Sequence, residues 1–164
     1  MKRLFRHALT GRWHVSRMLS SGASQAITDA VREAERGHSG QIRVVIEATP
    51  GIAHVLKRRA ARHRAIDIFT FERVWDTRYN NGVLLYLMVA ERDAEIVADR
   101  GLNGKVSPDQ WHEICVALER NVEGHGFTHA ICVAVSSIGR HLREHFPSDG
   151  GDNELPDDAV IRVR

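Results

Sequence analysis

The feature that most constrains this chain is an uninterrupted apolar run at residues 83–90, VLLYLMVA, set between polar turns. It is too short to span a bilayer, which takes roughly 20 residues. Apolar side chains at every position predict a strand that is covered on both of its faces. The polar segment ERDA then predicts a tight turn, and residues 95–98 predict an antiparallel return strand. A β-hairpin is therefore expected at the centre of the fold.

The register of this hairpin decides which polar residues meet. With a short turn at residues 92–93, we expect Ala90 opposite Glu95, Tyr86 opposite Asp99, and Gly82 near Asn103. This pairing returns residues 99–103 to the end of the sheet at which residues 80–81 begin the apolar strand. The sequence therefore predicts a polar rim at one end of the sheet.

Periodic segments flank the hairpin on both sides. Apolar spacings of three and four predict helices over residues 24–37, 52–75, 107–122 and 127–146, the first capped by Ser24 and the third by Ser107. Alternation in QIRVVIEA predicts a strand over residues 41–48, and AVIRV near the end is a candidate fourth strand. This order predicts one α/β domain, a three-layer α/β/α sandwich whose small mixed sheet contains the central antiparallel hairpin. We assign it residues 23–146, between a basic arm at 1–22 and a polar tail at 147–164.

Composition sets the broad class of protein. With 164 residues and 43% hydrophobic content, the chain can bury one core, and 27% charged residues are ordinary for a globular domain. Cys115 and Cys132 lie in apolar helical patterns without metal-ligand spacing, so we expect reduced thiols in the core. No apolar segment of a signal peptide follows the basic start. The sequence therefore predicts a cytoplasmic protein.

The N-terminal arm is strongly basic. Five cations precede the first acidic residue, Asp29: Lys2, Arg3, Arg6, Arg12 and Arg17. The other 18 basic residues face all 21 acidic ones, which leaves the rest of the chain with a net charge of −3. The apolar residues of the arm are Leu4, Phe5, Leu9, Trp13 and Leu19. Such a segment suits an anionic membrane surface or a partner protein, and the alternatives are a frayed or docked basic tail and a transit peptide, which has the same composition.

Side chains that carry oxygen gather at the polar rim. They are Asp76, Asn80, Asn81, Asp99 and Asn103. Ca²⁺ binds about six to eight oxygens, which carboxylates, amides and main-chain carbonyls at a sheet end can supply. Asn and Asp are also the residues that turns require. The rim is thus a candidate cation site, with ordinary turn chemistry as the alternative.

Two further motifs have simpler explanations. HLREH at residues 141–145 places two histidines one helical turn apart, as in some zinc peptidases, but no downstream acidic ligand is marked. The basic run KRRAARHR at residues 57–64 has no aromatic residue among its charges, which favours a solvated helix face over nucleic-acid binding. Neither a serine nucleophile elbow nor a phosphate-binding loop is present in the sequence.

Several segments in combination resemble the TPM-domain family. They are SGQIRVVIE (39–47), NNGVLLYL (80–87), EIVADRGLNGKV (95–106), SSIGRHLREHFP (136–147) and NELPD (153–157). The chain looks most like the short, non-exported bacterial form, whose function is unknown. The resemblance implies a three-layer α/β/α sandwich. Related domains are credited with acid phosphatase activity and photosystem repair in the thylakoid lumen, with membrane-anchored accessory roles, and with Ca²⁺ at one end of the sheet.

This resemblance transfers to individual residues with three changes. Exported members have Asp-Asn-Gly before the central strand, whereas this chain has Asn80 at the Asp position, with Asn81 and Gly82 matching. Asn103 stands in place of the Glu of Gly-Leu-Glu-Gly, and Gln41 stands where another Glu is common. Each change removes a carboxylate, so the resemblance implies weaker Ca²⁺ binding.

Two functions remain open on this basis. The first is a non-enzymatic binding or accessory module, supported by the lack of a catalytic motif and by the basic arm. The second is a metal-dependent, acid phosphatase-like hydrolase, with Asp99 as main ligand or base and the amides orienting phosphate oxygens.

Overall fold

The computed structural model describes residues 21–48, 61–89, 91–149 and 153–162. Its helices are α3 (Ser21–Ala34), α5 (Ala61–Phe71), α6 (Pro108–His125) and α7 (Phe127–His145). Its strands are β1 (Gln41–Glu47), β2 (Gly82–Met88), β3 (Asp93–Ala98) and β4 (Val160–Arg162), and η1 (Arg100–Leu102) is a 3₁₀ turn. Among these described helices, none has the length and apolar character needed to cross a bilayer.

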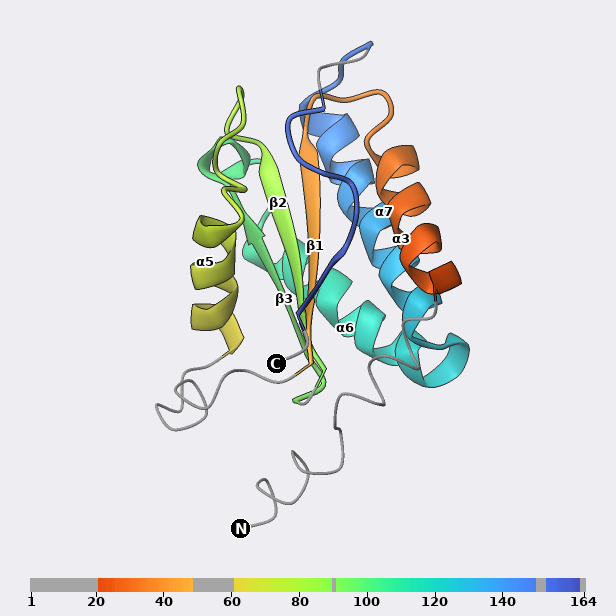
Figure 1. Ribbon diagram of the computed structural model, residues 1–164. Helices are drawn as coiled ribbons and strands as arrows, with labels where there is room; N and C mark the ends of the chain where they lie inside the picture. The colour runs from red at the N-terminus through yellow and green to blue at the C-terminus, as the bar shows by residue number, and fades with distance from the viewer. Residues whose placement is uncertain (1–20, 49–60, 90, 150–152, 163–164) are drawn as a thin grey trace.

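The strands form one mixed sheet between two layers of helices (Figure 1). The strand order is β3-β2-β1-β4, with β1 parallel to both β2 and β4 and with β2 antiparallel to β3. Helices α3, α7 and α6 cover one face, and α5 covers the other. The predicted three-layer α/β/α sandwich is confirmed.

The strand β2 lies between two cores, which explains its apolar run. Val83, Leu85 and Leu87 belong to the larger core beneath α3, α6 and α7, and the alternate residues belong to the smaller core beneath α5. All seven residues of the strand are buried. Full burial of one aliphatic side chain contributes about 1.5–3 kcal/mol, so both faces of this strand stabilise the fold.

The helix predicted over residues 52–75 ends earlier than expected, so the predicted C-terminal end is wrong. Residues 52–60 of this prediction lie outside the described part of the chain. Helix α5 ends at Phe71 because Arg73 adopts a left-handed φ of 55°, and the Val74 N–H donates back to the Phe69 carbonyl at 3.0 Å. This is the geometry of a helix-terminating motif. Val74 is nevertheless fully buried, so its apolar character extended the helical pattern past the true end.

The predicted hairpin register is also wrong. Tyr86 pairs with Glu95 rather than with Asp99, and the Asp99 N–H donates to the Gly82 carbonyl at 2.9 Å. The turn falls before residue 93, because Asp93 already pairs with Met88 and the Arg92 N–H donates to the Val89 carbonyl. Asp99, rather than Asn103, therefore returns beside the start of β2.

The C-terminal segment 153–162 is part of the folded unit. The main-chain N–H groups of Glu154 and Leu155 donate to the Gln41 side-chain oxygen at 2.9 and 3.0 Å, and Leu155 is buried in the smaller core. The segment then pairs with β1 as the short strand β4. The candidate fourth strand in the sequence is present.

Candidate functional site

The polar rim begins at the loop that precedes β2. Asn80 has a left-handed φ of 52°, a conformation that Asn tolerates better than most residues. Its side-chain oxygen accepts from Arg100 Nε at 3.0 Å, and its carbonyl accepts from the Gly101 N–H at 2.8 Å. These two bonds hold η1 against the loop.

Gly101 makes this close approach possible. A Cβ at this position would lie 2.5 Å from the carbonyl oxygens of both Tyr79 and Asn80. Atoms do not approach so closely, and main-chain carbonyls cannot move aside as a flexible side chain can. The glycine of the GLNG segment therefore has a steric role at the rim.

Asn81 is the most deeply buried residue of the rim, with an exposed fraction of 0%. Its main-chain N–H donates to Thr77 Oγ1 at 3.0 Å, and its Nδ2 donates to Ser39 Oγ at 3.2 Å. The remaining polar atom of the side chain, Oδ1, is buried and has no hydrogen-bond partner in the described part of the chain. A polar acceptor in this condition is rare in folded proteins.

Asp99 is the second residue of the rim with such an atom. Its exposed fraction is 9%, and its Oδ1 accepts from the Arg100 N–H at 2.7 Å, which caps η1. Its other carboxylate oxygen, Oδ2, is buried and finds no donor among the described residues. Because Asp99 is hydrogen-bonded to Gly82, it lies directly across from the residue that follows Asn81.

The structure brings Asn80, Asn81 and Asp99 to one end of the β2–β3 pair but does not place the other candidates with them. Asp76 is exposed and forms an ion pair with Arg73. Asn103 is exposed, ends η1, and lines the groove between β3 and α6. Gln41, which the resemblance associated with the same site, binds the C-terminal segment instead.

The rim offers some, but not all, of the oxygen ligands that a hard cation needs. Asn81 Oδ1 and Asp99 Oδ2 are oxygen acceptors without donors, which is the chemistry that Ca²⁺ or Mg²⁺ prefers. However, the described residues contain no group of three or more His, Cys, Asp or Glu arranged to hold a metal ion. Amide and main-chain oxygens would have to complete the coordination of a cation here.

The HLREH motif at residues 141–145 and the basic run at residues 57–64 both contact neighbouring elements of the fold. The ring of His141 packs edge-on against Trp111 with centroids 5.6 Å apart, and burial lowers the pKa of this histidine. Among the described residues of the basic run, Arg62 and His63 are exposed, as expected for a solvated face, whereas Arg64 is half-buried and donates to both oxygens of Glu47 at 2.6 and 2.9 Å. Arg62 also donates to the Ile96 carbonyl, so both arginines tie α5 to the sheet. The rest of the run, residues 57–60, lies outside the described part.

Sequence reasoning missed the buried Glu47, which is 1% exposed and also accepts from the Tyr86 hydroxyl at 2.6 Å. Burial acts to raise the pKa of Glu47, but the hydrogen bonds from Arg64 and Tyr86 outweigh it, so the pKa is lowered. The available signal was a carboxylate directly after the apolar residues 44–46 of this strand. This group fastens α5 to β1 and β2.

The cysteines are free thiols, as expected. Cys115 is buried, whereas Cys132 is only partly buried and donates to the Ala26 carbonyl at 3.7 Å. Burial raises the pKa of both thiols, that of Cys115 to about 12. Thiols with raised pKa values are poor nucleophiles, so these residues serve packing.

The chain was compared with protein families, curated proteins and solved structures. A family model described as the TPM domain matches residues 15–141. Among solved structures, the chain is similar to the BA42 protein of the psychrophilic bacterium Bizionia argentinensis, determined by NMR, with 31% identity and a TM-score of 0.73. That similarity covers 87% of this chain and 94% of BA42. A search of curated proteins found no match.

Proposed function

The chain belongs to the TPM domain family. We propose that it is a non-enzymatic binding module that holds a divalent cation at the end of its β2–β3 pair. The observation that carries the proposal is the pair of buried oxygens without donors, Asn81 Oδ1 and Asp99 Oδ2. Leaving a buried acceptor unsatisfied costs about 1–3 kcal/mol, and more for a charged one. A bound cation would offset that cost.

The proposed cation is Ca²⁺, bound weakly. Asn81 and Asp99 would be its side-chain ligands, and Asp99 would be the only carboxylate among the three residues that meet at the rim. The number of charged ligands tunes calcium affinity, so we expect a Kd on the order of 10⁻⁴–10⁻³ M. A site of this strength would respond to millimolar calcium.

Thermal unfolding with increasing CaCl₂ tests this part of the proposal. At 10 mM Ca²⁺ and a Kd of roughly 1 mM, the linkage relation gives about 1.4 kcal/mol of stabilisation, a rise of a few degrees in Tm. Asp99→Asn should abolish the rise, and Asp109→Asn, which changes an exposed carboxylate at the start of α6, should retain it. An equal rise in both variants, or none in the wild type, would contradict a site at Asp99.

The alternative is the metal-dependent, acid phosphatase-like hydrolase. The geometry favours binding over this chemistry because Asp99 Oδ1 is already engaged as a cap and Arg100 Nε is engaged by Asn80. Hydrolysis of p-nitrophenyl phosphate at acid and neutral pH, with Ca²⁺, Mg²⁺ or EDTA, separates the two functions. Metal-dependent turnover that disappears in Asp99→Asn would establish the hydrolase and overturn the non-enzymatic proposal.

We further propose a cytoplasmic location at the periphery of a membrane, with the basic N-terminal arm as the contact. The support is the charge of the arm, five cations ahead of the first acid. Flotation with anionic phosphatidylserine vesicles, compared between the full chain and a chain that lacks residues 1–20, is the test. Equal flotation of the two chains would remove the membrane contact.

A further inference from the structure

A groove lies at the end of the sheet opposite the polar rim. It has a volume of about 670 Å³ and runs between the β2–β3 turn, the last turns of α6 and the start of α7. Its walls include Val89, Val122 and Phe127, three apolar side chains that pack on the larger core yet remain only partly buried. The groove thus leaves apolar surface open to a ligand.

The rim of the groove is acidic. Asp93, Glu119 and Glu123 line it, against one cation, Arg92. Glu119 and Glu123 are exposed residues of α6, while Asp93 is half-buried, and its burial and the neighbouring Glu91 raise the pKa of its carboxyl. A ligand that combines apolar side chains with cations complements such a groove.

The chain itself carries a segment with this chemistry. Residues 1–20 contain no acidic residue, and their five cations alternate with bulky apolar side chains such as Phe5, Leu9 and Trp13. The rest of the chain is net acidic, at −3. Residues 48–67 also contain five Lys or Arg, but Asp67 lies among them and residues 61–67 belong to helix α5.

The topology brings this segment to the groove. Helices α3 and α7 are parallel neighbours, since Cys132 meets Ala26 and a Cβ on Gly139 would meet Ala34 further along both helices. The starts of both helices therefore lie at the end of the molecule that holds the β2–β3 turn (Figure 1), and Phe127, the first residue of α7, lines the groove together with Arg92 and Asp93 of the hairpin. Neighbouring helix axes are about 8–10 Å apart, and twenty residues reach up to about 66 Å when extended. The segment is attached close to the groove and is long enough to enter it.

We propose that residues 1–20 bind in the groove of their own chain. Their apolar side chains would cover Val89, Val122 and Phe127, and their cations would lie against Asp93, Glu119 and Glu123. Membrane contact by the same arm would then require it to leave the groove. This intramolecular contact does not depend on a cation at the polar rim.

The test is photo-cross-linking in the full chain, with benzoylphenylalanine in place of Trp13 and mapping by mass spectrometry. We expect cross-links to concentrate on residues 87–94 and 118–127. Mixing isotopically light and heavy chains separates the contact within one chain from a contact between two copies. Cross-links that join light to heavy chains, or that scatter over the surface, would overturn the proposal.

Charge reversal provides the matched control. Glu119→Lys with Glu123→Lys should lower cross-linking to the groove by about tenfold, since two ion pairs of this kind together contribute on the order of one decade in affinity. Asp109→Lys with Glu113→Lys makes the same change of charge on exposed residues of the same helix, outside the groove, and should leave the yield unchanged. An equal loss in both variants would show that overall charge, rather than the groove, holds the arm.

Discussion

The C-terminal segment and the polar rim both bury polar groups, but they satisfy them differently. Arg43 of β1 donates to two carbonyls of the segment, those of Pro156 and Asp158, at 2.7 and 2.9 Å, and to Glu72 at 3.0 and 3.2 Å. At the rim, Asn81 Oδ1 and Asp99 Oδ2 have no donor within the described residues. The only such atom described in the segment is Arg162 Nε, whose guanidinium pairs with Glu72.

Buried polar groups with and without hydrogen-bond partners have different effects on the fold. A satisfied network fixes one arrangement of the chain and stabilises it. An unsatisfied acceptor weakens the fold and persists where a ligand supplies the missing partner. The C-terminal network therefore serves structure, and the proposed role of the rim is binding.

The largest effect is expected from breaking the satisfied network at Glu72. Its carboxylate accepts from both Arg43 and Arg162, and all three side chains are at most 15% exposed. Glu72→Ala would leave two largely buried guanidinium groups without their acid, a loss of about 3–5 kcal/mol in the free energy of unfolding. Urea unfolding measures it.

The matched control is Glu33→Ala on α3. Glu33 also pairs with an arginine, Arg36, but their side chains are 69% and 76% exposed. Removing an exposed pair changes stability by roughly 0–1 kcal/mol. Similar losses in the two variants would show that the Glu72 network contributes no more than a surface ion pair.

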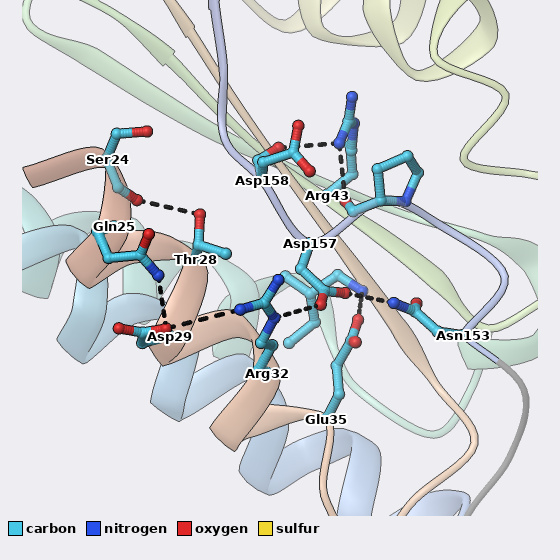
Figure 2. A network of polar contacts seen from close by, with 12 residues as sticks. Ser24, Gln25, Thr28, Asp29, Arg32, Glu35, Arg43, Asn153, Asp157 and Asp158 are labelled. Atoms are coloured by element: carbon cyan, nitrogen blue, oxygen red, sulfur yellow. Dashed lines mark hydrogen bonds and ion pairs between the residues drawn. The ribbon is translucent and has the colours of Figure 1, made fainter. Parts of the chain in front are cut away.

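A pH-dependent effect is expected where α3 meets the C-terminal segment (Figure 2). Glu35 accepts from the Ile42 N–H at 2.7 Å and lies beside Asp157, and burial, with this second carboxyl, raises its pKa to about 8. The folded state thus holds a proton that the unfolded state, with a pKa near 4.5, releases. Stability must therefore fall as pH rises from about 5 to above 8, by at most about 1.4 kcal/mol per unit.

Urea unfolding between pH 6.5 and 9.5 measures this dependence. Below that window, His38 acts with the opposite sign, because burial lowers its pKa and acid protonates it in the unfolded state first. Glu35→Gln keeps an acceptor for Ile42 and a donor for Asp157 at every pH, so it should flatten the curve. An unchanged slope in this variant would assign the pH dependence to another group.

Local patterns predicted the layers of this fold, while the contacts that complete it come from distant segments. The apolar run of β2 required cover on both faces, and α7 matched its periodic segment almost residue for residue. The end of α5 was misplaced because buried Val74 continued the helical spacing while Arg73 turned the chain. Local sequence does not encode which of these two influences prevails.

The sequence predicted at which end of the sheet the candidate site lies, but not which of its residues contact one another. The polar residues before the first strand and after the second strand of the hairpin indicated that Asn81 and Asp99 would meet. The error in the predicted register added Asn103 to this set of candidate ligands. Ser39, which binds Asn81, lies 42 residues away in the chain, and Gln41 binds residues more than 110 positions away. Pairings of such separation follow from topology, which single-sequence patterns do not specify.

A carboxylate restored at the rim tests whether its oxygens bind a cation. Asn80→Asp adds a charged oxygen beside Asn81 in a left-handed conformation that Asp also tolerates. Calcium affinity, measured by titration calorimetry, should rise about threefold to tenfold with this charge. Asn103→Asp is the matched control: Asn103 is exposed, follows the end of η1 and is not among the proposed ligands, so this change should leave the affinity unchanged. A stronger response to Asn103→Asp would move the site toward the β3–α6 groove.

The smallest change in stability is expected from Asp99→Asn without calcium. The amide keeps an oxygen to cap the Arg100 N–H and removes a buried charge whose Oδ2 has no donor, so stability should change by less than about 1 kcal/mol or rise. Glu72→Gln makes the same acid-to-amide change in the satisfied network and should be clearly destabilising, since the charge there holds two arginines. Urea unfolding of both variants in EDTA gives the comparison directly. If Asp99→Asn is as destabilising as Glu72→Gln, the carboxylate of Asp99 stabilises the fold itself, and the rim belongs with the structural networks.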